Sequence, residues 1–136
     1  FDGVVERSDM RQIIKRLKTG RAMWYAADQD YGPKHSVFAP FFDIRTATIT
    51  VSSRLAQRND SPVLMLHQLR DIDRRTWTLR FSPVLDDFAQ GDLQADATQL
   101  NQLLETSLRQ TPDQYLWMHR RFKTRPNGED SFYRRG

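Results

Sequence analysis

The stretch AMWYAADQDYGP (residues 22–33) decides the fold class, because an apolar run ends there abruptly in a polar turn. Residues 22–27 predict a short buried strand, and residues 28–33 predict the turn that ends it. A helix is predicted just before the strand. Helix, strand and polar loop in this order are typical of an α/β protein, in which ligands gather beyond the carboxyl ends of the strands.

The helix before this strand is predicted from apolar residues three and four positions apart, namely Met10, Ile13, Ile14 and Leu17. Ser8 has a side chain suited to the N-cap, and Gly20 is a natural residue just past the last turn. After the strand, residues 35–43 (HSVFAPFFD) carry three phenylalanines. A surface loop seldom does so, and we therefore expect this segment to pack against the body of the protein.

Residues 44–58 allow two interpretations. Ala47, Ile49 and Val51 alternate with polar residues as in a strand, whereas Thr46 could cap a helix that runs through Leu55 and Ala56. The local pattern slightly favours the strand.

The second half of the chain predicts a hairpin followed by two helices. Residues 62–68 and 76–83 are the two strands of the hairpin, joined by a charged connection. Asp92 caps the next helix, whose apolar stripe consists of Leu93, Ala97, Leu100, Leu104 and Leu108. Thr111-Pro112-Asp113-Gln114 has the residues that begin a further helix, which would carry Tyr115 to Met118 into a basic tail.

Composition places the chain among ordinary globular proteins. Its 136 residues suit one domain or a large piece of one, and the absence of cysteine excludes disulfides, thiolate zinc sites and a cysteine nucleophile. No leader is visible, and no apolar stretch approaches the ~20 residues that span a bilayer. The net charge of +4 lies entirely in the last twenty residues, which indicates a local anionic partner.

Two motifs are candidate binding sites. The DQDYG loop (Asp28, Gln29, Asp30, Tyr31 and Gly32) is either a simple turn or a pocket edge whose carboxylates accept hydrogen bonds from sugar hydroxyls or amides, or bind a divalent ion. The second motif is a run of cations among aromatic residues, comprising Arg120, Arg121, Lys123 and Arg125. It is either a solvated tail or a phosphate-binding surface for nucleic acid, a phosphorylated glycolipid or a carrier protein.

The blocks MWYAADQDYGPKHSVFAPFF (23–42), SRLAQ (53–57), PVLML (62–66) and PDQYLWMHRRFKTRPNG (112–128), in this order, resemble the lauroyl and myristoyl acyltransferases of lipid A biosynthesis. The resemblance covers residues 7–133. It implies transfer of a fatty acyl chain from acyl carrier protein to a hydroxyl of a phosphorylated lipid A precursor. It implies no cofactor, no metal and no nucleic acid partner.

The resemblance also implies an architecture. The fold would be α/β, a glycerolipid-acyltransferase-like mixed sheet flanked by helices, of which residues 1–136 form an incomplete C-terminal part. An amino-terminal membrane helix and the histidine–acid pair would belong to the part not included here, and the full-length protein would act at the cytoplasmic face of the bacterial inner membrane. Residues 46–58 would be a helix, the DQDYG loop would lie beside the acceptor pocket, and Arg54 would be a further candidate near it.

Acyl transfer to a hydroxyl usually needs a general base. In glycerolipid-type acyltransferases this base is a histidine with a carboxylate five positions later. His35, His67 and His119 are followed at that spacing by Pro40, Ile72 and Thr124. We therefore expect no catalytic residue in this chain and no activity from it alone.

Two other functions compete with this interpretation. A metal-dependent glycosyltransferase would use Asp28-Gln29-Asp30 to hold the ion, but no nucleotide-binding motif accompanies it. A basic RNA-binding module would need aromatic residues exposed on a sheet beside the cations, whereas here they are expected to pack beneath them. If the chain is part of a larger fold, we also expect an unpaired sheet edge and apolar side chains left uncovered around residues 22–27 or 37–42.

Overall fold

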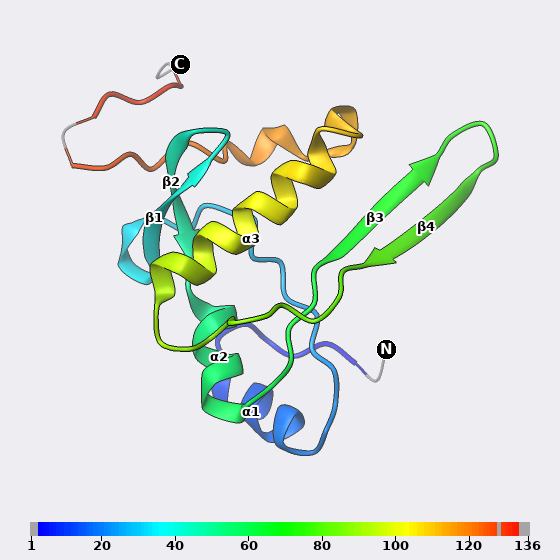
Figure 1. Ribbon diagram of the computed structural model, residues 1–136, viewed down its shortest axis with the longest axis vertical. Helices are drawn as coiled ribbons and strands as arrows, with labels where there is room; N and C mark the ends of the chain where they lie inside the picture. Colours follow the sequence, from blue (N-terminus) through cyan, green and yellow to red (C-terminus); the bar gives the residue numbers. More distant parts are fainter. Residues whose placement is uncertain (1–2, 128, 134–136) are drawn as a thin grey trace.

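The computed structural model describes residues 3–127 and 129–133. Three α-helices and four strands follow one another along the chain: α1 (Met10–Lys18), β1 (Ser36–Phe41), β2 (Ile44–Ile49), α2 (Val51–Asn59), β3 (Leu66–Asp71), β4 (Thr76–Phe81) and α3 (Leu93–Leu108) (Figure 1). Short 3₁₀ turns span Pro33–His35, Pro112–Gln114 and Trp117–His119.

The strands form two separate antiparallel hairpins. β1 pairs with β2, with Phe38 opposite Ala47, and β3 pairs with β4, with Gln68 opposite Leu79. Among the described residues each sheet has only two strands, so each strand has one unpaired edge. The predicted combination of helices and strands is confirmed at this level. The larger glycerolipid-acyltransferase-like sheet stays a prediction.

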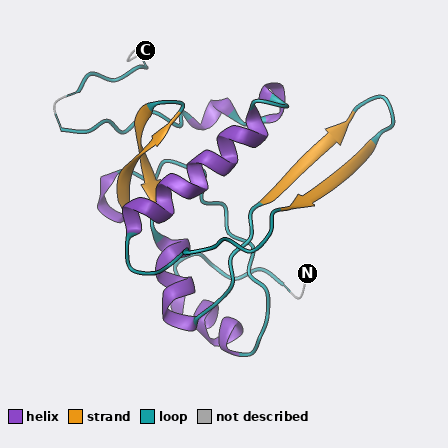
Figure 2. Cartoon of the chain, in the orientation of Figure 1, coloured by secondary structure: helices purple, strands orange, loops and turns teal. Residues whose placement is uncertain are grey.

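The core lies where α3 crosses the β1–β2 hairpin (Figures 1 and 2). Ala39 and Phe41 of β1 and Ala47 of β2 have no exposed surface. Asn101 of α3 fastens the layers, because its Nδ2 donates to the Pro40 carbonyl at 2.9 Å and to Thr48 Oγ1 at 3.0 Å. A second apolar cluster joins α2 to α3 through Ala56, Phe88 and Leu100.

The predicted helices are largely confirmed. α1 forms where the apolar spacing places it, but its cap is Asp9 rather than Ser8, since the Asp9 carboxylate accepts the amide of Gln12 at 2.9 Å. α3 is capped by Asp92 as predicted. Residues 44–58 contain both of the alternatives, with β2 ending at Ile49 and α2 beginning at Val51.

Two predicted secondary-structure elements are wrong. Residues 22–27 are irregular, since among the described residues no strand pairs with them, and Trp24 is 63% exposed. Residues 36–41, for which only packing against the body was predicted, do pack inward and form a strand. Residues 112–119 form two 3₁₀ turns instead of one helix, and Trp117 Nε1 donates to the Pro112 carbonyl at 2.8 Å between them.

The β3–β4 hairpin projects away from the rest of the chain (Figure 2). All six residues of β4 are exposed. Near the turn that joins its strands the hairpin is held by the side-chain amide of Gln114, which accepts from Arg70 N at 2.8 Å and donates to Arg70 O at 3.0 Å. Within residues 3–127 and 129–133, no helix has the length and apolar character needed to cross a bilayer.

Candidate functional site: the DQDYG loop and the C-terminal segment

The DQDYG loop is a turn held by its own side chains. Asp30 Oδ1 accepts the amide of Gly32 at 2.8 Å, and Tyr31 Oη donates to Gln29 Oε1 at 2.6 Å. Gly32 has φ of 83°, a backbone conformation that favours glycine. The guanidinium of Arg7 covers the Tyr31 ring at 4.6 Å. The sequence therefore folds locally into the polar turn that its residue types predict.

This turn is tied to the C-terminal segment (residues 115–127) through Asp30. The Asp30 carboxylate accepts the amide of Thr124 on Oδ2 at 2.8 Å and the hydroxyl of Thr124 on Oδ1 at 2.8 Å. Asp30 is only 4% exposed. With the Gly32 amide, three donors of the chain satisfy this carboxylate, as a buried charge requires.

A second tie runs from Tyr115 to the same loop. Tyr115 Oη donates to the backbone carbonyl of Asp28 at 3.1 Å. Burial, followed by the negative charge of Asp28, raises the pKa of Tyr115 well above its usual value, while Arg121 opposes this. The phenol therefore stays protonated and can keep donating this hydrogen bond over the physiological range of pH.

Arg121 is the centre of the site and is 1% exposed. Its Nη1 donates to the Ala47 carbonyl at 2.6 Å, and its Nη2 donates to Thr48 Oγ1 at 3.0 Å and to Asn101 Oδ1 at 3.2 Å. Burial lowers the pKa of Arg121, and the nearby Tyr115, Asp30 and Asp28 oppose the shift. Arg121 thus joins the C-terminal segment to both β2 and α3.

Aromatic rings pack beneath this cation. The Arg121 guanidinium lies 5.4 Å from the centre of the Phe41 ring, and Phe122 stacks on Phe41 with ring centres 5.7 Å apart. Tyr115 lies 6.4 Å from Phe41. The ring under Arg121 therefore belongs to β1. Tyr115 and Phe122 of the C-terminal segment pack on that ring, whereas Trp117 of the same segment is exposed.

A shallow depression opens beside the two ties. It is lined by Gln29, Asp30, Tyr31, His119 and Lys123, from the DQDYG loop and from the C-terminal segment. Its volume of about 220 Å³ is below the range of pockets for drug-sized ligands and suits one phosphate or part of a sugar. Lys123 is exposed, and its ammonium has no ion-pair or hydrogen-bond partner in the described part of the chain.

The other predicted cations lie apart from this depression or are already engaged. Arg54 is exposed on α2, and its Nε donates to Thr50 Oγ1 at 3.2 Å. Arg120 lies 5.8 Å from the centre of the Tyr133 ring. Arg125 donates to the Arg45 carbonyl at 2.8 Å and forms an ion pair with Glu129. The structure therefore brings Gln29, Asp30, Tyr31 and Lys123 together. The acceptor-binding roles of all these residues stay predictions.

Sequence reasoning missed three residues of this site. Thr124 holds Asp30 from 94 positions away, His119 lines the depression, and Asn101 fixes Arg121 from α3. No spacing rule connects residues so distant in the chain. The one available signal was that His119 and Thr124 lie within the cationic block of residues 119–125.

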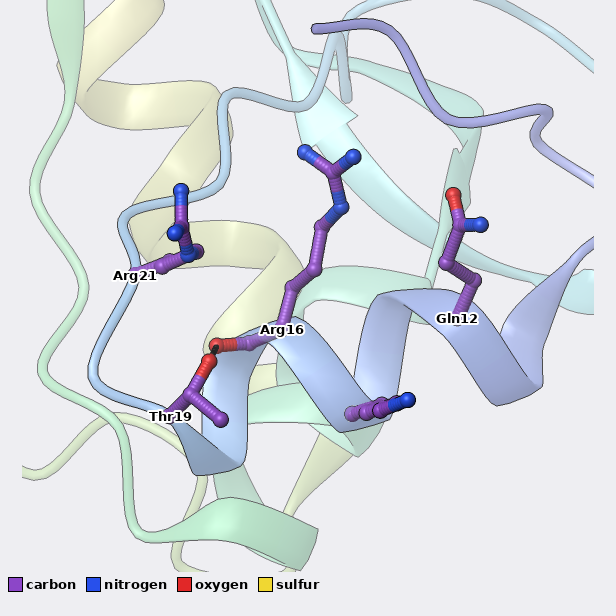
Figure 3. Close-up of a pocket in the computed structure, with 5 residues that line it drawn as sticks. Gln12, Arg16, Thr19 and Arg21 are labelled. Carbon is purple, nitrogen blue, oxygen red and sulfur yellow. Dashed lines mark hydrogen bonds between the residues drawn. The ribbon is translucent and has the colours of Figure 1, made fainter. Parts of the chain in front are cut away.

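A second depression lies on α1, away from any predicted site residue. Gln12, Lys15, Arg16, Thr19 and Arg21 line it, and Figure 3 shows the Thr19 hydroxyl, which donates to the Arg16 carbonyl at 2.8 Å. The sequence count placed the excess charge at the C-terminal end. The structure adds a local group of cations, Lys15, Arg16 and Arg21, near the N-terminal end of the described chain. The acidic residues that balance their charge in the count for residues 1–116 lie elsewhere in the sequence.

Comparison with known proteins identifies the family to which this chain belongs. Residues 2–124 match the model of the bacterial lipid A biosynthesis acyltransferase family, and the chain belongs to this family. The match includes the DQDYG loop, Tyr115 and Thr124, which form the two ties, and Arg121, which joins the C-terminal segment to β2 and α3.

Curated relatives agree with this assignment. The chain is 38% identical over 131 residues to the lipid A biosynthesis palmitoleoyltransferase of Escherichia coli K12, a match that covers 96% of this chain and 42% of that protein. It is 37% identical over 131 residues to the lauroyltransferase of the same strain, covering 96% and 43%, and 31% identical over 126 residues to its myristoyltransferase, covering 93% and 39%. The chain therefore spans about two fifths of the length of these relatives.

Proposed function

We propose that a protein containing this chain transfers a fatty acyl chain from acyl carrier protein to a hydroxyl of a phosphorylated lipid A precursor. The observation that carries the proposal is the family match over residues 2–124. Relatives named as palmitoleoyl, lauroyl and myristoyl transferases support acyl transfer as the reaction class. The cytoplasmic face of the bacterial inner membrane, where both substrates could meet, is part of the proposal.

In this proposal the chain supplies the acceptor side of the site. The depression between the DQDYG loop and the C-terminal segment receives a polar part of the lipid headgroup. Lys123 offers an exposed ammonium for a phosphate, and Gln29 and Tyr31 offer polar atoms for sugar hydroxyls. Asp30 and Arg121 have a structural role in this proposal, because their buried contacts hold the walls of the depression in place.

The general base is proposed to lie in the part of the relatives that this chain does not match. None of the three histidines has a carboxylate five positions later, and among the described residues none forms an ion pair with a carboxylate. His67 instead forms a hydrogen bond with the Ser107 hydroxyl. The unmatched part would also complete the glycerolipid-acyltransferase-like sheet and provide membrane association, so that residues 1–136 form one portion of a single acyltransferase domain.

A metal-dependent glycosyltransferase gains no support from the loop geometry. Three hydrogen-bond donors of the chain already occupy the Asp30 carboxylate, and Asp28 is tied through its backbone to Tyr115. Among the described residues, no group of three acidic, histidine or cysteine side chains is placed to hold an ion.

A chimera tests the proposed function. Residues 1–136 replace the matched segment of the E. coli palmitoleoyltransferase, and transfer from acyl carrier protein to a phosphorylated lipid A precursor is measured. We expect the folded chimera to be active within about tenfold of its parent, a difference of about 1.4 kcal/mol in the barrier. The chain alone should give no turnover. A folded chimera that is inactive with every acyl donor would refute the function, and sustained turnover by the chain alone would refute the location of the base.

A further inference from the structure

The apolar hairpin face consists of Trp77, Leu79 and Phe81, which alternate along β4. These side chains are 61%, 55% and 64% exposed. Alternate residues of a strand point to the same side, so the three lie together on one face of the hairpin. Opposite them on β3 are Arg70, Gln68 and Leu66.

The other face of the hairpin turns toward the rest of the chain. His67, opposite Arg80, forms a hydrogen bond with Ser107 of α3, and Arg80 Nη1 donates to Gln110 Oε1 at 3.5 Å. These contacts fix the orientation of the hairpin and direct the apolar hairpin face away from α3. Its exposure therefore follows from how the hairpin is anchored.

The hairpin is also incomplete as a sheet. A two-stranded hairpin is marginally stable alone in water, and stable sheets usually have three or more strands or a covering helix. The side chain of Gln114 closes the outer edge of β3 at Arg70. β4 has β3 on one side and, within the described residues, no strand on the other. An exposed edge beside three large apolar side chains is typical of a surface that binds another polypeptide.

The length of the relatives indicates which polypeptide binds this surface. The matches cover 96% of this chain but only 42% of the E. coli palmitoleoyltransferase. We propose that the apolar hairpin face and the free edge of β4 dock against the part of the lipid A acyltransferase fold that this chain does not match. The proposal rests on family membership and does not depend on the catalytic role of the chain.

Co-purification tests the proposal with two polypeptides. One is the full 136-residue chain, and the other is the tagged E. coli palmitoleoyltransferase without its 131 matched residues. The two are co-expressed and then purified in detergent. The wild-type chain should co-purify. The triple variant Trp77→Ser/Leu79→Ser/Phe81→Ser should be recovered at least about tenfold less, a loss of about 1.4 kcal/mol or more in binding. The control Thr76→Ala/Thr78→Ala, on the other face of the same strand, should stay within about twofold of wild type.

Hydrogen exchange on the wild-type chain gives a second measurement that requires no substitution. Amides of residues 76–81 should exchange at least about tenfold more slowly in the complex than in the free chain, because a docked strand edge is protected. This result would support the interface even if the triple variant failed to fold. If the two polypeptides form a complex that has no enzymatic activity, the docking surface is supported and the proposed function is not. The chimera experiment tests that function separately.

Several outcomes would overturn the proposal. These are the absence of a complex with the wild-type chain, equal recovery of the triple variant, and unchanged exchange of residues 76–81 in the complex. The proposal would also fail if the same face instead mediated a dimer of the chain, binding to anionic vesicles or salt-sensitive binding to single-stranded RNA, with no affinity for the relative's segment.

Discussion

The C-terminal segment and the β3–β4 hairpin contrast in how they meet the rest of the chain. The C-terminal segment has little regular structure, yet it is anchored through two almost completely buried side chains, its own Arg121 and Asp30 of the DQDYG loop. The hairpin has regular hydrogen bonding, yet all of β4 is exposed. Regular secondary structure and integration into the fold are therefore separate properties in this molecule.

Specific polar contacts account for the difference. Arg121 reaches β2 and α3 through three hydrogen bonds, and Asp30 receives two from Thr124. The hairpin is fastened mainly at Arg70 and His67. A segment without strands or long helices can be held firmly by a few buried side chains that form hydrogen bonds to other elements.

Arg121→Met should produce the largest loss of stability. The substitution removes the Arg121 donors from the buried Ala47 carbonyl and Asn101 Oδ1, and it leaves Thr48 Oγ1 with the hydrogen bond that Asn101 donates. We expect the free energy of unfolding to fall by about 3 kcal/mol in urea denaturation. The exposed Arg58→Met is the matched control and should change it by less than about 0.5 kcal/mol. A similar small change for Arg121→Met would contradict the central role of this side chain.

Thr124→Val should have an intermediate effect. Valine keeps the shape but removes the hydroxyl that donates to Asp30 Oδ1, while the backbone donor to Oδ2 remains. The free energy of unfolding should fall by about 1.5 kcal/mol, the scale of one hydrogen bond to a charged group. Thr124→Ser retains the donor and should recover most of this loss. Equal losses for valine and serine would show that the methyl group matters and the hydroxyl does not.

Leu79→Ser should barely change stability in the free chain. Its side chain is more than half exposed, so the substitution removes little buried apolar surface. We expect a change below about 0.5 kcal/mol by thermal or urea unfolding. A loss above about 2 kcal/mol would mean that the hairpin is packed in solution, and the contrast with the C-terminal segment would disappear.

His67 should give a small dependence of stability on pH. Burial, followed by the charge of Arg80, lowers the pKa of His67 below its usual value of 6.5. Below about pH 6.5 the unfolded state therefore binds more protons at His67 than the folded state does. The stability contributed by neutral His67 is complete above pH 6.5 and is lost as the pH falls through the lowered pKa of the folded state. His67→Gln should lose less stability than wild type between pH about 7.5 and about 5 in urea unfolding. A greater loss in the variant would reverse the assigned direction.

Local sequence patterns correctly predicted the helices and strands that depend on neighbouring residues. The spacing in α1 and α3, the Asp92 cap and the β3–β4 hairpin all follow from residues close together in the chain, although β3 lies at Leu66–Asp71 and not at the predicted residues 62–68. The strand predicted at residues 22–27 failed because a strand requires a partner, which local apolarity cannot supply. Family resemblance added α2, while the alternating pattern before it correctly indicated β2.

The candidate site was predictable in its blocks but not in its connections. Residue types singled out the DQDYG loop and the cations of the C-terminal segment, and the structure joins them through Asp30 and Thr124. The sequence could not distinguish buried Arg121 from exposed Lys123, two cations two positions apart. The distinction depends on which side chain reaches acceptors on β2 and α3, and that is set by tertiary packing.

The central claim is that the depression beside these ties binds the phosphorylated acceptor. Steady-state kinetics of the Lys123→Ala chimera test it most directly, with Lys18→Ala on α1 as the control for loss of an exposed charge. We predict that KM for the phosphorylated lipid A precursor rises at least about tenfold, with kcat within about twofold and the control unchanged. An unchanged KM in a folded and active Lys123→Ala chimera would contradict the claim.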